Sequence, residues 1–212
     1  MNKHSQLVQD IVNSYKDAEC ELNFANNYQL IVAVILSAQC TDKRVNQTTP
    51  ALFKKYPTVY HMSQANLQEL EQIIKPCGFY HNKAKNLIAM AKGVVTNHNG
   101  NIPNTKQQLT SLAGVGEKTA NVVLATAFKV PAIAVDTHVF RVSNRLGLAN
   151  AQTVEKTQKQ LEKHVAKKHW INLHYALVLH GRYICKAIKP KCSECQFSNN
   201  CKHYVNSSKV KQ

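Results

Sequence analysis

Residues 112–120 read Leu112-Ala113-Gly114-Val115-Gly116-Glu117-Lys118-Thr119-Ala120 and connect two segments of helical spacing. Glycine accepts positive φ angles and lets another backbone come close, so two glycines here predict a tight turn. A Gly-x-Gly turn that opens a helix directs unpaired backbone N–H groups outward, which suits a phosphate group. The stretch therefore predicts a phosphate-binding hairpin between two helices, although an ordinary helix–helix turn fits the same letters.

Helical periodicity runs along the rest of the chain as well. A first helix is predicted from the spacing of Leu7, Val8, Ile11 and Val12, with Ser5 as its cap. Further helices are expected near residues 28–40, 43–56, 63–75, 82–98, 106–113, 117–128, 138–147, 153–165 and 172–185. No stretch alternates in the manner of a strand, so the predicted fold class is all-α. Six of these helices lie between residues 26 and 129, which suggests two lobes, with the first helix packing on the C-terminal lobe.

The charge balance indicates the kind of partner. The 212 residues include 27 Lys and Arg against 12 Asp and Glu, a formal net charge of +15. Such a field attracts polyanions, either nucleic acid or an anionic membrane surface, although a basic protein without a nucleic-acid role remains possible. The longest apolar run, Leu30 to Leu36, is far shorter than the roughly 20 residues that span a bilayer. No secretory signal is visible in residues 1–20, so we expect a cytoplasmic protein without a membrane partner.

Four cysteines cluster near the C-terminal end. They are Cys185, Cys192, Cys195 and Cys201, separated by six, two and five residues. Zinc sites usually bring two close pairs together across a longer loop, whereas a compact run of four thiolates is typical of ferredoxin-like ligation. The spacing therefore favours a [4Fe–4S] cluster over zinc, and either over a set of scattered core cysteines.

The surroundings of the cluster are basic. Lys186, Lys189 and Lys191 lie between the first two cysteines, and Pro190 stiffens that loop. A metal centre could hold these lysines in a fixed shape against phosphates. The lysines could equally serve only to offset the negative charge of a thiolate-ligated centre.

Lys118 follows the glycine turn by two residues and is a candidate nucleophile. It shares a helix face with Val122 and Ala125, so its neighbours on that face are apolar. Apolar surroundings and the positive end of a helix dipole both disfavour the charged form of a lysine, which makes its amine nucleophilic. The alternative is an ordinary surface lysine whose charged end reaches water.

At this point the chain resembles the endonuclease III family. The glycine hairpin resembles that family's helix–hairpin–helix, and the cysteine spacing matches its [4Fe–4S] loop. Two further segments fit in the same order and spacing over nearly the whole chain: Ile35-Leu36-Ser37-Ala38-Gln39-Cys40-Thr41-Asp42 and Ala134-Val135-Asp136-Thr137-His138-Val139.

The resemblance implies a fold of two lobes. Residues 21–132 would form a six-helix barrel that contains the helix–hairpin–helix. Residues 1–20 together with 133–212 would form a helical domain around the [4Fe–4S] cluster, with Cys185, Cys192, Cys195 and Cys201 as its ligands.

The resemblance also implies a function, which is that of a bifunctional DNA glycosylase. Such an enzyme excises oxidised pyrimidines and then cleaves the strand at the abasic site through a lysine Schiff base. Lys118 would be the nucleophile and Asp136 the essential carboxylate, although Asp136 could also simply cap the helix that follows it. The expected partner is double-stranded DNA containing damaged bases or abasic sites, bound by a monomer.

Further residues are expected to contact the DNA. Gln39 would fill the space left by the extruded base, and Phe79 stands where the family commonly has a leucine that wedges into the duplex. Phenylalanine can also wedge and stack. The remaining predicted DNA contacts are the backbone amides of Gly114, Val115 and Gly116 and the side chains of Lys189 and Lys191.

Three other classes of protein share some of these features. The adenine-specific glycosylase of the same superfamily also carries a cluster but typically lacks the hairpin lysine. A non-catalytic DNA-binding module with a four-cysteine zinc site would not need Lys118 or Asp136. A redox protein would use the cluster for electron transfer, but nothing in the sequence resembles a flavin or nicotinamide site.

Overall fold

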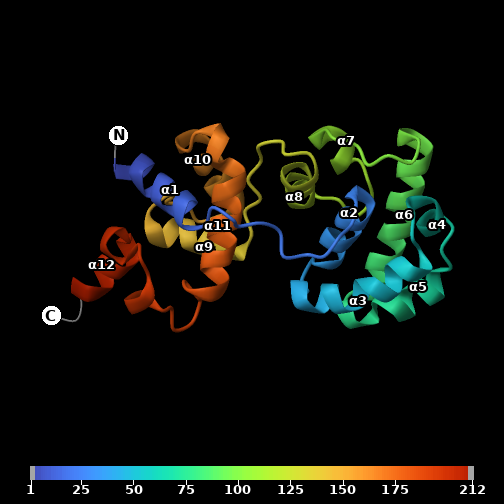
Figure 1. The fold of residues 1–212 in the computed structure, drawn as a ribbon, viewed down its shortest axis with the longest axis horizontal. Helices are drawn as coiled ribbons and strands as arrows, with labels where there is room; N and C mark the ends of the chain where they lie inside the picture. Colours follow the sequence, from blue (N-terminus) through green and yellow to red (C-terminus); the bar gives the residue numbers. More distant parts are fainter. Residues whose placement is uncertain (1–2, 210–212) are drawn as a thin grey trace. The chain divides into compact units, whose positions relative to one another are not determined.

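The computed structural model describes residues 3–209, with side chains through Val205, and all regular elements in that range are helices. The prediction of an all-α fold is therefore confirmed. The chain divides into two compact units (Figure 1). The central unit is Glu21–Lys129, and the terminal unit combines Met1–Cys20 with Val130–Gln212. The sequence-based division had assigned residues 130–132 to the central unit.

The central unit contains seven α-helices rather than the six predicted, because the segment predicted as one helix near 63–75 is preceded by a separate short helix. The helices are α2 (Asn27–Leu36), α3 (Asp42–Lys55), α4 (Val59–Ser63), α5 (Leu67–Ile74), α6 (Tyr80–His98), α7 (Lys106–Thr110) and α8 (Glu117–Ala127). A polar side chain starts most of them by accepting a backbone N–H at the N-cap. These caps are Asn26, Thr41, Thr58, Asn66 and Thr105.

Helix α2 forms the centre of this unit. Every residue from Leu30 to Leu36 is buried, so the helix is apolar on all sides and must be enclosed by others. It packs against α3, α6 and α8, and Figure 1 shows it between α6 and α8. This packing fixes the ends of α2, α6 and α8, where the candidate DNA-contacting residues lie.

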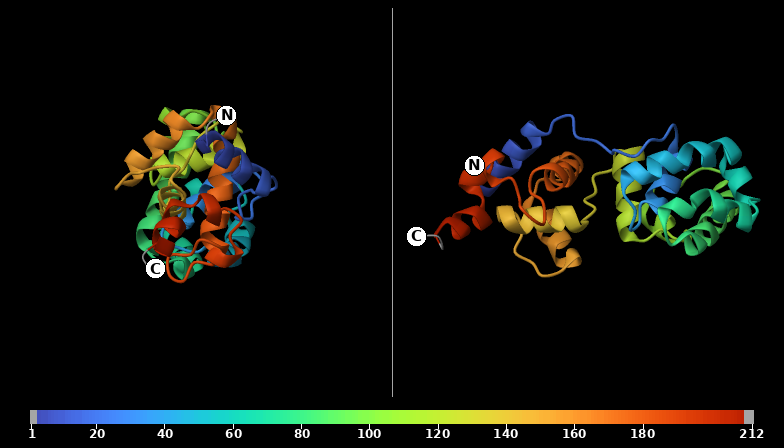
Figure 2. Two further views of the ribbon diagram at one scale, coloured as in Figure 1. Left: turned by 90° about the vertical axis from the view of Figure 1, so that its left-hand side faces the viewer. Right: turned by 90° about the horizontal axis from the view of Figure 1, so that it is seen from below.

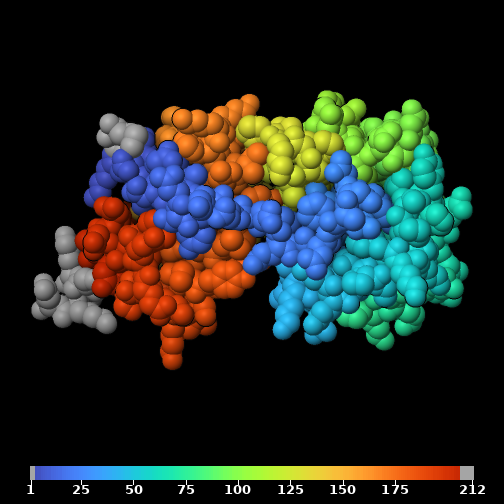
Figure 3. Space-filling view, viewed as in Figure 1, coloured from blue at the N-terminus to red at the C-terminus, as the bar shows by residue number. Residues whose placement is uncertain are grey.

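The terminal unit is built from both ends of the chain. Its helices are α1 (Lys3–Ser14), α9 (Thr137–Leu146), α10 (Val154–His164), α11 (Trp170–Tyr183) and α12 (Lys202–Lys209). Helix α1 packs against α11, and Figures 2 and 3 show the N-terminal segment lying among the C-terminal helices of this unit. Ser5 is not a cap, because α1 begins two residues before it, and α12 was not predicted. No helix within residues 3–209 has both the length and the apolar character to cross a membrane.

Candidate nucleic-acid interface and metal centre

The glycine hairpin connects α7 and α8 of the central unit. Gly114 has a φ of +73°, and a Cβ atom at this position would lie 2.8 Å from the Cβ of Asn86 on α6. A side chain at Gly114 is thus excluded both by the backbone conformation and by the neighbouring helix. Gly116 has an ordinary negative φ and open space around it. The first glycine shapes the turn, and the second leaves the start of α8 accessible.

The amides of this turn differ in their availability. The Val115 N–H donates to the carbonyl of Leu112 at 3.2 Å, so it is already paired within the turn, and its contact with a phosphate stays a prediction. The amides of Gly114 and Gly116 form no hydrogen bond among the described residues. Gly116 also brings no capping side chain to α8, so this helix starts without a side-chain acceptor at its N-cap.

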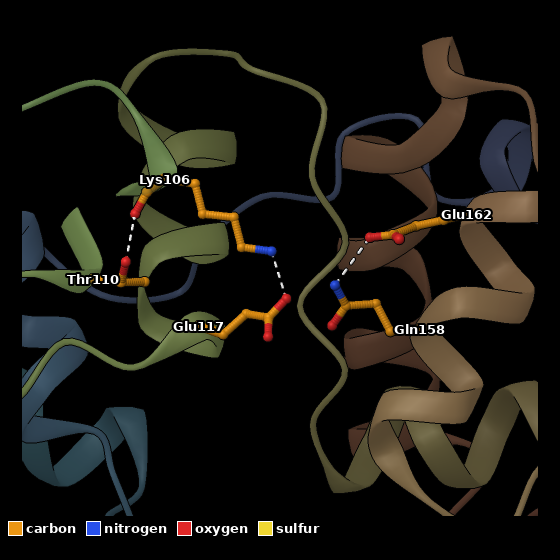
Figure 4. Close-up of polar contacts among 5 residues, drawn as sticks. All are labelled: Lys106, Thr110, Glu117, Gln158 and Glu162. Carbon is orange, nitrogen blue, oxygen red and sulfur yellow. Dashed lines mark hydrogen bonds and ion pairs between the residues drawn. The ribbon is translucent and has the colours of Figure 1, made fainter. Parts of the chain in front are cut away.

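Lys118 lies in the first turn of α8, and its side chain is exposed. Its side chain is therefore accessible to solvent, and its role as a nucleophile stays a prediction. Its neighbour Glu117 forms an ion pair with Lys106 of α7, which links the two helices of the hairpin, and Figure 4 shows the two side chains directed at each other. The hairpin thus presents an accessible lysine on a braced turn.

Asp136 is the N-cap of α9 in the terminal unit. Its Oδ1 atom accepts the backbone N–H of His138 at 2.9 Å and that of Val139 at 2.8 Å. The capping role weighed for this residue is therefore observed. Both bonds end on Oδ1, which leaves Oδ2 outside the cap. A single carboxylate can thus hold the helix start and still offer an oxygen to another group.

Gln39 and Phe79 occupy two loops of the central unit and share an unusual conformation. Both are exposed, and both have a positive φ, 53° for Gln39 and 49° for Phe79. Phe79 exposes 65% of its surface, which is a large exposed fraction for an apolar side chain. Non-glycine residues adopt the left-handed region at a cost and persist there only when their surroundings hold them.

Lys83, a residue that no sequence motif singles out, supplies that support. Its Nζ atom donates to the carbonyl of Leu36 at 2.9 Å and to that of Cys77 at 3.0 Å, so it joins the loop before Gln39 to the loop before Phe79. The side chain is buried, and this burial lowers the pKa of Lys83. The only sequence signal for this role is that Lys83 occupies a buried position of α6, whose other buried residues are apolar.

The four cysteines of the terminal unit line one pocket together with Arg145, His180 and Pro190. Burial, followed by the neighbouring cysteine thiols, raises the pKa of Cys192, and burial is also the main cause that raises the pKa of Cys195. Negative charge is therefore unfavourable in this pocket unless a cation is bound. Among residues 3–205, no three His, Cys, Asp or Glu side chains converge as ligands of one metal ion. The pocket gathers four soft donors, which fit an iron–sulfur cluster, without presenting a preformed single-ion site.

Two of the sulfur atoms also have nitrogen partners. Arg145 Nη1 donates to Cys185 Sγ at 3.6 Å, and His180 Nε2 lies 3.6 Å from Cys195 Sγ. The other ring nitrogen of His180 is 2.8 Å from the hydroxyl of Tyr15, which directly follows α1. Burial lowers the pKa of His180 to about 4, so the ring is neutral near pH 7. Such hydrogen-bonding neighbours orient ligands and tune the centre that they hold.

Arg141 and Arg145, both on α9, donate hydrogen bonds to backbone carbonyls around the first cysteine of the cluster. Arg141 donates to the carbonyls of Gly181 and Cys185, at 2.8 and 3.0 Å. Arg145 donates to the carbonyls of Lys186 and Ala187, at 2.7 and 3.2 Å. Both guanidinium groups therefore hold the loop that carries the first cysteine.

The two lysines predicted to contact DNA lie farther along that loop. Lys189 is exposed and has a positive φ of 49°. Lys191 is also exposed, but it forms an ion pair with Glu194 at 3.1 Å. Lys189 is therefore the more available of the two for a phosphate, since Lys191 would first have to leave its partner.

Comparison with known proteins identifies the class. Residues 32–167 match the family described as HhH-GPD superfamily base excision DNA repair protein. The chain is 47% identical over 189 residues to endonuclease III of Bacillus subtilis (strain 168), covering 89% of this chain and 86% of the relative. It is 43% identical to endonuclease III of Escherichia coli (strain K12), covering 86% of this chain and 87% of that protein.

Solved structures agree with these sequence matches. A trapped endonuclease III–DNA covalent intermediate superimposes with a TM-score of 0.91 at 41% identity, covering 98% of this chain and all of that chain. A non-covalent endonuclease III–DNA complex gives the same score and identity over 99% of this chain. A thermostable thymine-DNA glycosylase, at 24% identity and a TM-score of 0.86, shares the fold.

The chain thus belongs to the HhH-GPD superfamily of base excision DNA repair proteins, and within it to the endonuclease III family. It is a DNA-binding enzyme of the DNA N-glycosylase and AP lyase class.

Proposed function

We propose that this enzyme removes oxidised pyrimidines from duplex DNA and then cleaves the strand on the 3′ side of the abasic site. The observation that carries the proposal is the position of Lys118. This exposed amine lies in the first turn of α8, directly after a glycine turn whose Gly114 and Gly116 amides are unpaired. Phosphate bound by those amides would fix the DNA backbone next to the amine.

The first step is extrusion of the damaged nucleotide. A base inside the duplex hides its sugar, so it must leave the stack, at a cost of a few kcal/mol that is smaller for a damaged base. Gln39 and Phe79 are exposed on two loops that the buried Lys83 joins. We assign Phe79 as the wedge and Gln39 as the side chain that occupies the vacated space.

The second step is covalent. The neutral amine of Lys118 attacks C1′ of the sugar, the C1′–N bond breaks, and the base leaves with its electron pair and takes up a proton. Opening of the sugar ring converts the adduct to a Schiff base. Loss of a 2′ proton then expels the 3′ phosphate by β-elimination, and water releases the lysine.

Asp136 is assigned the electrostatic part of this chemistry. Its Oδ1 atom is committed to the cap of α9, so Oδ2 is the oxygen that would accept the proton of the lysine or stabilise positive charge on the sugar. The cap also fixes the rotamer of the carboxylate, which reduces the cost of orienting it during the reaction.

The four cysteines are assigned to a [4Fe–4S] cluster, which would cross-link four thiolates and fix the loop between Cys185 and Cys192. Arg141 and Arg145 already bond the backbone of this loop, and Lys189 lies exposed on it. The proposed role is structural and directed at DNA phosphates. A broad absorption band near roughly 400 nm is expected for the cluster and none for zinc.

The test of the mechanism uses borohydride, which reduces the Schiff base to a stable protein–DNA adduct. Lys118→Gln should bind a duplex containing thymine glycol but form no adduct. Lys92→Gln is the matched control, because Lys92 is an exposed helical lysine of the same unit, and it should form the adduct as the wild type does. An adduct with Lys118→Gln would reject the assignment of the nucleophile.

The preferred substrate is tested in the same assay with dihydrouracil, uracil, 8-oxoguanine and a plain abasic site. We propose that the enzyme works as a monomer on DNA in the cytoplasm. Sedimentation of the protein with and without duplex tests the monomer.

A further inference from the structure

His180 contacts two of the four cysteines through different atoms. Its Nε2 atom lies 3.6 Å from the Sγ atom of Cys195, and its backbone carbonyl accepts the N–H of Cys185 at 2.7 Å. The residue is 2% exposed, and the centroid of its ring lies 5.3 Å from that of Phe197, which follows Cys195 by two residues. His180 is therefore held by packing at a fixed place beside the cysteines.

Tyr15 contacts the same ring from the N-terminal segment. Its hydroxyl lies 2.8 Å from Nδ1 of His180, and the two rings are nearly perpendicular, at 86°. The N–H of Tyr15 donates to the carbonyls of Ile11 and Val12, so the residue continues the last turn of α1. Helix α1 packs against α11, which carries His180 (Figure 1), and Tyr15 lies against the core that both helices share. The position of the hydroxyl is thus set by the packing of the two helices.

The chemistry of imidazole couples these two contacts. A neutral ring, the form that burial favours, carries one N–H, so that one nitrogen donates while the other accepts. A free thiol at Cys195 can donate to Nε2, but a thiolate that ligates iron can only accept. With Cys195 as a ligand, the proton therefore has to be on Nε2, and Nδ1 has to accept. The Tyr15 hydroxyl is within hydrogen-bonding distance of Nδ1 and can supply the donor that this arrangement requires.

We propose that Tyr15 is a positioning residue for the cluster, because its hydroxyl donates to Nδ1 of His180 and thereby fixes the tautomer whose Nε2–H donates to the Cys195 thiolate. The inference rests on the [4Fe–4S] assignment of the proposed function. It makes the N-terminal segment part of the cluster site, through a residue that precedes His180 by 165 positions.

The expected consequence is a higher reduction potential of the cluster. A hydrogen bond to a ligand sulfur stabilises negative charge, and the reduced cluster carries one more negative charge than the oxidised one. Tyr15→Phe keeps the aromatic ring but removes the hydroxyl, so His180 loses the partner that selects its tautomer. We expect the equilibrium of the cluster to shift about 3–10-fold toward the oxidised form, where a tenfold change equals about 59 mV for one electron.

The test measures the reduction potential of the full-length protein by voltammetry, after a broad absorption band near roughly 400 nm has shown that the cluster is present. Tyr15→Phe should have a lower potential than the wild type. Tyr183→Phe is the matched control, since Tyr183 lies on the same helix as His180 and is 55% exposed, and it should keep the wild-type potential.

Resonance Raman spectra of the same samples provide a second readout. The Fe–S stretching bands that involve the cysteine sulfurs should shift when the wild type is transferred to D₂O, because the Nε2–H that reaches Cys195 exchanges for deuterium. This shift should be smaller in Tyr15→Phe and unchanged in Tyr183→Phe. A residue that only packs against the core would not alter it.

A double-mutant cycle tests whether Tyr15 acts through His180. His180→Phe removes the donor to Cys195, so it should lower the potential at least as far as Tyr15→Phe does. In that background, Tyr15→Phe should have no further effect. Should His180→Phe fail to fold, the Raman comparison of Tyr15→Phe with the wild type decides the same question.

Three results would overturn the inference. The first is a Tyr15→Phe protein with the wild-type potential, and the second is an equal effect of Tyr15→Phe with and without His180. The third is a Tyr15→Phe protein that folds but binds no cluster, because the hydroxyl would then govern assembly rather than the tautomer. Absence of the 400 nm band in the wild type would instead refute the [4Fe–4S] assignment of the proposed function.

Discussion

Replacing Lys83 with methionine should destabilise the central unit and disturb the two loops that carry Gln39 and Phe79. Methionine keeps most of the buried stem of Lys83 but removes the donor to Leu36 and Cys77. Both residues are buried, so neither carbonyl gains full access to water in exchange. The variant therefore isolates the two hydrogen bonds from the packing of the side chain.

The magnitude follows from these two bonds. Each hydrogen bond from a charged donor contributes about 1.5–3 kcal/mol, which gives about 3–6 kcal/mol for the pair. The variant also removes the burial of an ammonium group, a cost that is evident because burial lowers the pKa of Lys83. We expect a net loss of about 2–4 kcal/mol in the free energy of unfolding.

The pH dependence gives the reasoning a second check. Because the pKa of Lys83 is lower in the folded protein than in the unfolded chain, the folded state binds fewer protons between those two values. The wild type should thus gain stability relative to Lys83→Met as the pH rises from the lowered pKa toward about 10.4. The neutral amine can still donate both bonds, so the benefit is kept above that range.

The assay is urea unfolding followed by helical circular dichroism. Fluorescence is unsuitable, because the single tryptophan, Trp170, lies in the terminal unit and not in the central one. Lys85→Met is the matched control, since Lys85 is exposed on the same helix, and it should change stability by less than about 0.5 kcal/mol. Equal stability of Lys83→Met and Lys85→Met would refute the bracing role.

Three further changes test the site. Gly114→Ala should weaken DNA binding and lower the free energy of unfolding by more than about 1 kcal/mol, measured in urea. Gly116→Ala is the control and should be tolerated, because Gly116 has an ordinary φ and open space around it. Equal effects of the two changes would contradict this account of the turn. Asp136→Asn should keep the helix cap but lose excision activity. Asp136→Ala should lose the cap and the activity, and its free energy of unfolding should fall by about 1 kcal/mol. Full activity of the asparagine variant would exclude the carboxylate from the mechanism. Phe79→Ala should leave the midpoint of urea unfolding unchanged, because the side chain is exposed, but it should slow excision from duplex DNA. Phe79→Leu should excise at a rate close to that of the wild type. An alanine variant that excises as fast as the wild type would exclude Phe79 as the wedge.

Much of the fold was predictable because it depends on local signals. The all-α class follows from apolar spacing, and the caps at Asn26 and Thr41 are polar residues placed directly before helical patterns. The short helix α4 escaped because five residues carry too little periodicity to be recognised. The roles of Arg141 and Arg145 also escaped, because their partners are backbone carbonyls about 40 residues away, and such acceptors leave no trace in sequence.

The backbone conformations of Gln39 and Phe79 likewise could not be predicted from the sequence. Neither residue favours a positive φ, and each left-handed non-glycine residue costs on the order of 1–3 kcal/mol. No local pattern predicts such a conformation, since it exists only where tertiary contacts hold it. Lys83 provides such contacts by bonding the residue that ends α2 and the residue that precedes Gly78. The buried lysine therefore connects the helical scaffold to the two exposed side chains, and its removal should change the geometry of the loops that carry Gln39 and Phe79.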